Sequence, residues 1–141
     1  METLNEEMRA RLDEGKVVQL VPQGISMLPF IHGGRDKVLV RKEAVVKEGD
    51  IVLVPHGDHL ILHRVYAIHG PRLTLMGDGN LKGVEEVDLA EVMGTVVQIV
   101  RPDGRSLKPH KAWFWRHTRA VRRPMLKLRR KCCKLRKKNP E

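Results

Sequence analysis

The chain has 141 residues and a net charge of +10, a length that suits one domain whose core needs no disulfide or metal for support. The charge is uneven: residues 108–141 hold 14 Lys and Arg against one Glu, whereas residues 1–107 hold 13 basic and 16 acidic residues. The N-terminus is charged and no window approaches 18 consecutive apolar residues, so we expect neither a secretory signal peptide nor a membrane-spanning helix.

The first predicted element is a short helix over residues 2–15. Its apolar residues Leu4, Met8 and Leu12 recur every four positions among charged residues, as on one face of a helix.

Short segments rich in Val, Ile and Leu follow this helix. Several alternate apolar and polar residues, and Gly-, Asp- and Pro-containing turns separate them, which predicts β-strands. Short strands at this spacing indicate a mainly β domain, 1–107, built as a curled antiparallel sheet or open barrel. The segments are residues 16–21, 36–42, 50–56, 59–68, 72–78 and 92–100.

The basic tail, 108–141, is predicted to be largely helical over residues 113–138. Its apolar residues fall three, four and three positions apart, as a stripe on a helix otherwise covered by Lys and Arg. Either the helix docks on the domain, or it binds a membrane surface or nucleic acid. Aromatic residues at 113–115 favour the bilayer interface. The stripe consists of Met125, Leu128, Cys132 and Leu135. Adjacent cysteines rarely form a structural bridge, so Cys132 and Cys133 indicate a reducing compartment, or free thiols, and no disulfide framework.

Three residues are candidates for catalytic chemistry. Ser26 lies in the turn-like stretch "GISMLPFIHGG", and a serine hydroxyl needs a nearby base before it becomes a nucleophile. His63 lies within the apolar strand "LILHRVYAI", and Asp78 lies in the turn "LMGDGN". Taken singly, each has a structural explanation: a turn residue, a hydrogen-bonded core histidine and an ordinary Asp-Gly turn.

Taken in order, the motifs "GISMLPFIHGGRDKVLV", "EGDIVLV", "LHRVYAI" and "LTLMGDGN" resemble serine peptidases of the signal peptidase I and LexA-type repressor clan. The resemblance covers roughly residues 17–100. The His-Arg-Val sequence at residues 63–65 is similar to the branch that uses a histidine base, found in archaeal and endoplasmic-reticulum signal peptidases.

The resemblance implies a fold of the signal peptidase catalytic-domain type and a role for each candidate. Ser26 would be the nucleophile and its backbone N–H an oxyanion-hole donor, His63 the general base, and Asp78 the group that orients the imidazole. The chain departs from the family by carrying Gly24 where a serine often stands. The family's histidine branch also often has a second aspartate soon after the turn. Here that region reads "LKGVEEVD", where Glu85, Glu86 or Asp88 could take its place but none is fixed by spacing.

The function implied is a serine endopeptidase that cleaves a peptide or protein substrate, as in signal peptide processing. One alternative is a catalytically inactive binding module with this fold. Another is a self-cleaving regulator with a nucleic-acid-binding tail, although only about 16 residues precede the first strand.

We expect no cofactor and no metal, since a site formed by His56, His59 and His63 would need three rings to converge across a turn. The expected partners are the substrate and an anionic membrane surface bound by the basic tail, with nucleic acid as the less favoured alternative. This corresponds to a cytoplasmic protein attached peripherally to a membrane.

Overall fold

Strands dominate the computed structural model, which describes residues 2–24, 27, 30–77 and 84–109. The predicted tail helix lies outside these residues, and so do Ser26 and Asp78. The elements are α1 (Glu2–Asp13), β1 (Val18–Leu20), β2 (Lys37–Arg41), β3 (Ile51–His56), β4 (His59–His69), β5 (Arg72–Met76), β6 (Glu85–Asp88), the 3₁₀ turn η1 (Leu89–Glu91), β7 (Gly94–Val100) and β8 (Ser106–Leu107).

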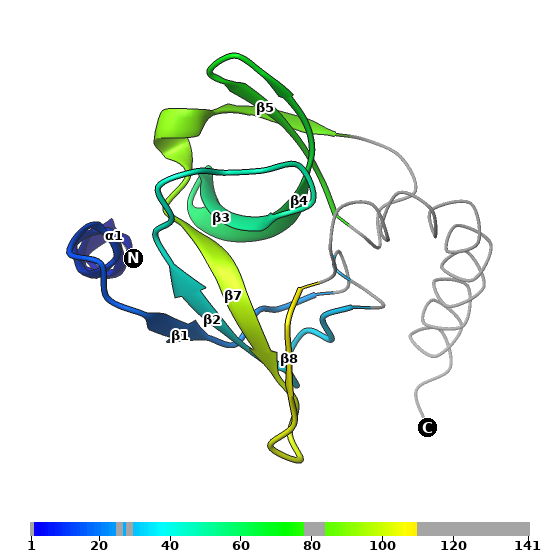
Figure 1. Ribbon diagram of the computed structural model, residues 1–141. Coiled ribbons are helices and arrows are strands. Elements are labelled where there is room, and N and C mark those ends of the chain that lie inside the picture. Colours follow the sequence, from blue (N-terminus) through cyan, green and yellow to red (C-terminus); the bar gives the residue numbers. More distant parts are fainter. Residues whose placement is uncertain (1, 25–26, 28–29, 78–83, 110–141) are drawn as a thin grey trace, which may run out of the picture.

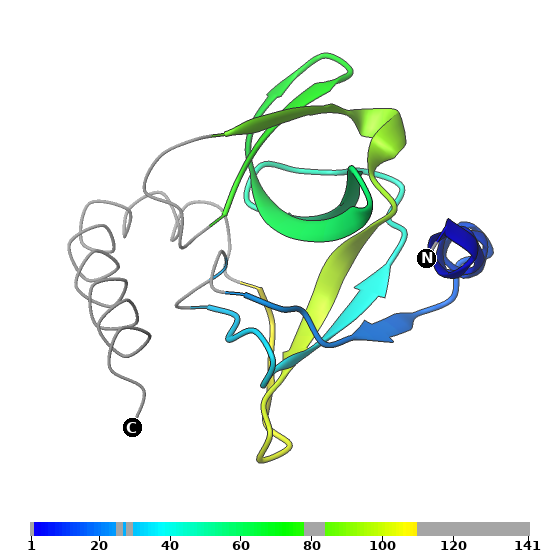
Figure 2. The same cartoon turned by 180° about the vertical axis from the view of Figure 1, so that it is seen from behind.

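The described strands form one antiparallel sheet in the order β1-β2-β7-β3-β4-β5-β6, and β8 pairs with β7. The long strand β4 bends strongly, so the part of the sheet from β3 to β6 curls over itself. Strands β1, β2 and β7 form the part of the sheet outside this curl, and α1 lies to the side next to β1 (Figures 1 and 2). The prediction of a mainly β domain with a curled antiparallel sheet and one short N-terminal helix is confirmed.

Both faces of the central strands are buried, which explains their nearly continuous apolar sequences. Ile51 and Leu53 of β3 belong to one core cluster, whereas Val52 and Val54, which alternate with them, belong to a second. In β4, Leu62 joins the first cluster. The curl therefore separates two small cores, and β3 and β4 contribute to both.

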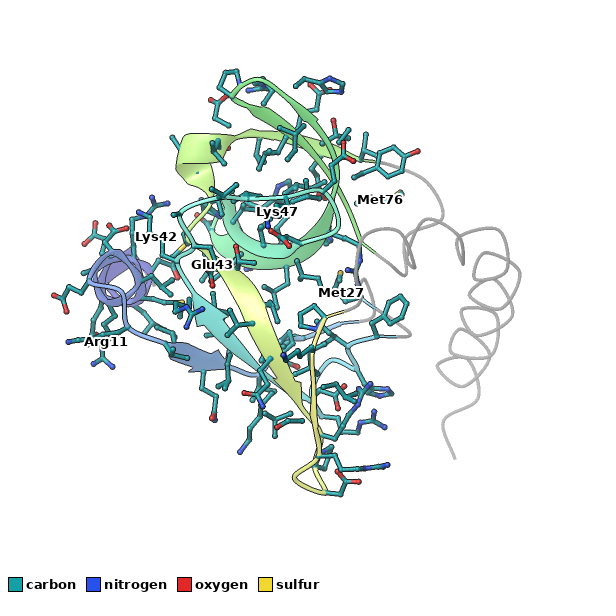
Figure 3. The ribbon with its side chains drawn as sticks, viewed as in Figure 1. Arg11, Met27, Lys42, Glu43, Lys47 and Met76 are labelled. Atoms are coloured by element: carbon teal, nitrogen blue, oxygen red, sulfur yellow. The ribbon has the colours of Figure 1, made fainter. Side chains whose placement is uncertain are left out.

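Helix α1 closes the first core. Leu12 is fully buried and Met8 packs beside it, but Leu4 is 60% exposed, so only part of the predicted apolar face is used. Asp13 at the end of the helix forms an ion pair with Lys42, with 2.5 Å between Oδ1 and Nζ, and Figure 3 shows Lys42 beside α1. Among the described residues, no helix is long and apolar enough to cross a membrane.

Two described strands, β6 and β8, were not predicted from the sequence. Strand β6 has the sequence Glu-Glu-Val-Asp, in which only Val87 is buried. It is held against β5 by backbone pairing and by ion pairs across the strands, one of them 2.9 Å between Arg72 Nη1 and Asp88 Oδ1. Pairing therefore outweighs the low strand propensity of three acidic residues. This short strand carries a residue of the candidate site.

Candidate functional site

His63 is a buried imidazole with a carboxylate partner. The residue is 4% exposed, and its Nδ1 contacts Oε2 of Glu85, whose side chain is 31% exposed. An imidazole held at Nδ1 by a carboxylate has its ring orientation fixed and presents Nε2 as the other ring nitrogen. This is the geometry required of a general base that a third group orients.

Strand register explains why Glu85 reaches His63. Val65 of β4 pairs with Leu75 of β5, which in turn pairs with Glu85 of β6. Paired residues point to the same face of a sheet, and so do residues two apart on one strand. His63 and Glu85 therefore share a face, separated by the width of β5. A glutamate side chain is long enough to extend back along this face toward the ring.

The loop that contains Ser26 reaches β4 on either side of His63. Met27, the residue after Ser26, is 4% exposed and belongs to the same core cluster as Leu62. The Phe30 ring lies 5.2 Å from Cζ of Arg64, within the range of a cation–π contact. Leu62 and Arg64 are the two neighbours of His63 in the sequence. Both alternate with His63 along β4 and so point to the opposite face of the strand. The described flanks of the serine are thus anchored to the strand that carries the candidate base, on the face opposite to that shared by His63 and Glu85.

Arg64 is fully buried, and it connects this loop to the turn before β3. Its Nη1 donates a 2.7 Å hydrogen bond to the carbonyl oxygen of Gly49, in addition to the contact with Phe30. The backbone of the same turn pairs with β4: the Val65 N–H donates to the carbonyl of Asp50 at 2.7 Å. Burial raises the pKa of the Asp50 carboxyl, although a hydrogen bond from the Lys47 N–H opposes the shift. The "EGD" motif therefore braces β4 next to His63.

The two ends of the Ser26 loop meet in a narrow neck. The Gly34 N–H donates a 2.7 Å hydrogen bond to the carbonyl of Pro22. A Cβ added to Gly33 would lie 2.1 Å from the carbonyl oxygen of Gly24, far inside van der Waals contact, so only glycine fits there. Gly24 itself has a φ of +87°, a conformation that L side chains rarely adopt. Both glycines are thus required to close the loop in this form.

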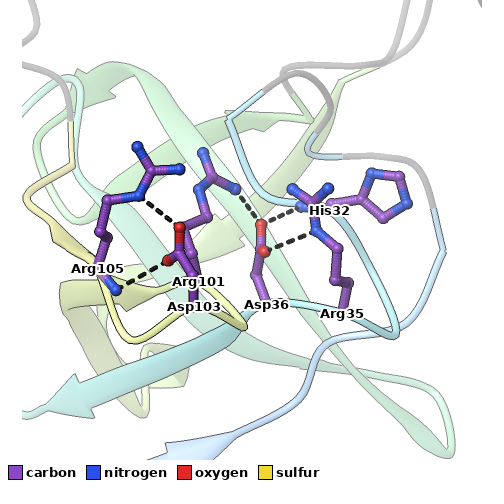
Figure 4. A network of polar contacts seen from close by, with 6 residues as sticks. All are labelled: His32, Arg35, Asp36, Arg101, Asp103 and Arg105. Carbon is purple, nitrogen blue, oxygen red and sulfur yellow. Dashed lines mark hydrogen bonds and ion pairs between the residues drawn. The ribbon is translucent and has the colours of Figure 1, made fainter.

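Below the neck, the fully buried Asp36 fixes the end of the loop (Figure 4). Its Oδ2 accepts a 2.8 Å hydrogen bond from the His32 N–H and contacts Nη1 of Arg101, while its Oδ1 accepts from Nε of Arg35 at 3.1 Å. Burial opposes ionisation of this carboxyl. The hydrogen bond from His32 and the two guanidinium groups outweigh burial and hold its pKa below the ordinary value.

A pocket of about 420 Å³ lies between the Ser26 loop and β4. Gly24 and Met27 line it from the loop, and Ile61 and Leu62 line it from the strand just before His63. Most of its wall is apolar, with Asn5, Asp58 and His59 among the polar residues that line it. A pocket bounded by both flanks of a candidate nucleophile and by the strand that carries a candidate base is well placed to hold a substrate side chain.

The predicted site residues have different outcomes. His63 is described and is paired with Glu85, which the sequence offered only as one of three replacements for a missing acid. Asp78 and Ser26 lie outside the described residues, so their predicted roles stay predictions. Glu86 is exposed, and Asp88 pairs with Arg72 instead of the histidine. Within the described part of the chain, no three His, Cys, Asp or Glu residues are grouped so that they could hold a metal.

Sequence reasoning missed the buried Arg64 and Asp36. Arg64 is part of the His-Arg-Val sequence, whose central arginine was a signal that we could have used. Asp36 opens the strand-like stretch "DKVLVRK", and nothing in that pattern distinguishes it from a turn residue.

A family model described as Peptidase S24-like matches residues 2–97, which include β1 to β6, most of β7 and the pair His63 and Glu85. The chain belongs to this family. The Peptidase S24-like match supports the predicted relation to the LexA and signal peptidase I clan of serine peptidases, and the curled β fold agrees with it. No curated protein matches the S24-like chain at a significant level.

Proposed function

We propose that this S24-like chain is a serine endopeptidase of the histidine-base type, with Ser26 as nucleophile, His63 as general base and Glu85 as the orienting acid. The observation that carries the proposal is the buried imidazole of His63 with Glu85 on its Nδ1. It is supported by the burial of Met27 in the core cluster of Leu62 and by the contact of Phe30 with Arg64, which attach both flanks of Ser26 to the strand that carries His63.

In the proposed reaction, Ser26 Oγ attacks the substrate carbonyl carbon while Nε2 of His63 takes the hydroxyl proton. The carboxylate of Glu85 stabilises the imidazolium, which then protonates the leaving amine. A water molecule, deprotonated by the same nitrogen, releases the acyl group and restores Ser26. The backbone N–H of Ser26 is the proposed donor to the oxyanion, and Gly24 brings no hydroxyl to assist it.

The pocket beside the loop supports a substrate whose side chain next to the cleaved bond is apolar. Leu20, Ile31 and Leu53 line this pocket together with Met27 and Leu62. Burial of one aliphatic side chain there would contribute about 1.5–3 kcal/mol of binding free energy. We infer that the enzyme selects substrates by this contact more than by charge.

Replacement of Glu85 by glutamine should lower kcat by up to about 10⁴-fold, the scale observed when a triad carboxylate becomes an amide. The amide can orient the ring in the wrong tautomer and cannot stabilise the imidazolium. Cleavage of a mixed-sequence peptide library by the full chain, read by mass spectrometry, measures the effect. Asp78→Asn, assayed in parallel, tests the acid that the sequence motif implies.

Glu86→Gln is the matched control for Glu85→Gln, because Glu86 is the next residue on β6 and is exposed. It should retain the activity of the unmodified chain. Equal activity of the two glutamine variants would contradict the role of Glu85. If Asp78→Asn alone were inactive, the orienting acid would be Asp78. Fragments of the chain itself in the incubation would identify a self-cleaving peptidase.

We also propose that the basic tail attaches the enzyme to anionic membranes. Residues 108–141 carry 14 basic residues, and each Lys or Arg near an anionic surface contributes about 1 kcal/mol. Replacing Arg129, Arg130, Lys131 and Lys134 by glutamine should therefore weaken partitioning roughly 10³-fold at low salt.

Flotation with anionic and with neutral vesicles measures this binding, and neutral vesicles should leave the full chain in solution. Salt alone cannot distinguish the partners, because binding to lipid and to nucleic acid both weaken as salt rises. A full chain that ignores anionic vesicles but shifts DNA or RNA would show that the tail is a nucleic-acid arm.

A further inference from the structure

A second hollow, of about 440 Å³, lies at the end of β7 and is lined by three arginines. Figure 4 shows the guanidinium groups of Arg101 and Arg105 extending in the same direction, with Arg35 beyond Asp36. The lining residues are Arg35, Arg101, Pro102, Asp103, Arg105 and Leu107, none of which belongs to the proposed catalytic group.

Asp36 and Asp103 bind these three arginines, and each guanidinium group uses only part of its N–H donors in these contacts. Asp36 engages Nε of Arg35 and Nη1 of Arg101, and Oδ2 of Asp103 accepts from Nε of Arg105 at 2.6 Å. A guanidinium has five N–H donors, so each arginine keeps donors beyond those used by its carboxylate. The buried Asp36 in particular fixes Arg101, whose side chain is only 20% exposed. Donors held in this way lose little side-chain entropy when they bind a ligand.

The charge in and around the hollow is positive. Three arginines face two aspartates, and Lys37 and Lys108 adjoin this group in the sequence. Neither lysine has an ion-pair partner among the described residues. The two carboxylates therefore neutralise only part of the positive charge, and an anionic ligand can neutralise the rest.

We propose that this hollow binds one phosphate group. Guanidinium groups recognise phosphate through paired N–H donors, which suits three arginines that converge on one space. Leu107 is 44% exposed and gives the rim an apolar part, against which the acyl chains next to a phospholipid headgroup would lie. The basic tail begins at the next residue, Lys108. A phospholipid headgroup bound here would hold the described domain against the surface to which the tail is attracted.

The test is an NMR titration of the full chain with sodium phosphate, replacing chloride at constant ionic strength. Saturable shifts should appear in the backbone amides of Arg101, Arg105 and Leu107. Arg105→Gln should weaken the response about ten-fold, because it removes charge-assisted donors. Arg41→Gln should leave it unchanged, because Arg41 is an exposed arginine that is likewise paired with one carboxylate, that of Glu43, but lies outside the hollow.

A second pair of titrations identifies the source of the phosphate. Monomeric dihexanoyl phosphatidylglycerol should shift the same amides and the Leu107 methyl groups at lower concentration than inorganic phosphate, if the ligand is a lipid headgroup. Equal affinity for the two would assign a free phosphate compound. Shifts confined to residues 110–141, or shifts at Leu107 that persist undiminished in both Arg105→Gln and Arg35→Gln, would overturn the proposal. These readouts need no peptidase activity, so they do not depend on the proposed reaction.

Discussion

Replacement of Ser26 by alanine should abolish peptide cleavage while leaving the fold unchanged. Removal of the nucleophile from a serine peptidase lowers kcat by about six orders of magnitude, since no other group forms the acyl intermediate. The lost hydroxyl is proposed to serve chemistry, so thermal unfolding should be unaffected. Cleavage of the peptide library and the melting temperature of the full chain are the two measurements.

The chain provides a matched control, because Ser106 is its other serine and lies exposed on β8. Ser106→Ala should cleave the library as the unmodified chain does. Covalent labelling by a serine-directed phosphonate should likewise occur at Ser26 and disappear in Ser26→Ala and in His63→Ala. Unchanged products from Ser26→Ala would refute the assignment of the nucleophile.

Replacement of Asp36 by asparagine should lower the free energy of unfolding more than any of the other substitutions proposed above. Removal of one partner from a buried ion pair leaves the other charge uncompensated, at a cost of about 3 kcal/mol. For a domain of this size the melting temperature should fall on the order of 10 °C. Arg101, 20% exposed, and the His32 N–H would both lose a charged acceptor.

The pH dependence provides a second readout of Asp36. Its pKa is lower in the folded than in the unfolded chain, so its ionisation stabilises the fold above the ordinary aspartate value. This contribution is lost as the pH falls through the lower, folded pKa. Urea unfolding between about pH 7 and pH 3 should show this acid-dependent loss in the unmodified chain, and Asp36→Asn should lack the corresponding part.

Asp103→Asn is the appropriate comparison, since Asp103 also pairs with an arginine but in an exposed position. Exposed pairs contribute little to stability. A loss of stability in Asp103→Asn equal to that in Asp36→Asn would contradict the importance of burial.

The strands of the core were predictable because burial on both faces leaves a strong apolar signal in the sequence. Strand β3, for example, has four consecutive buried residues, Ile51 to Val54. Strand β6 was not predictable, since Val87 is its only buried residue and its pairing with β5 depends on register. The alternation of apolar and polar residues depends on burial. It therefore does not reveal a strand that is held mainly by backbone hydrogen bonds and ion pairs.

The same distinction applies to the candidate site. His63 could be selected because a polar residue in an apolar strand needs a partner. That partner depends on which residues of β6 lie opposite which residues of β5, and the sequence does not contain this register. From the sequence, Glu85 was therefore only one of three candidate acids. The fold places Glu85 on His63, whereas Glu86 and Asp88 contact Arg72. Asp78 was selected instead because it lies in the "GDGN" turn, which is one of the motifs that carry the family resemblance.

The contact between Gly33 and Gly24 has a practical meaning for protein engineering. The close approach of these two glycines joins the two ends of the stretch between them. Loop libraries and exchanges between related chains are therefore best cut outside the two glycines, so that the joint is transplanted together with the loop. A graft limited to "SMLPF" would transfer the serine without the two glycines at which the ends of the loop meet. The pair of glycines, and the chain length between them, is the part that a designer has to preserve.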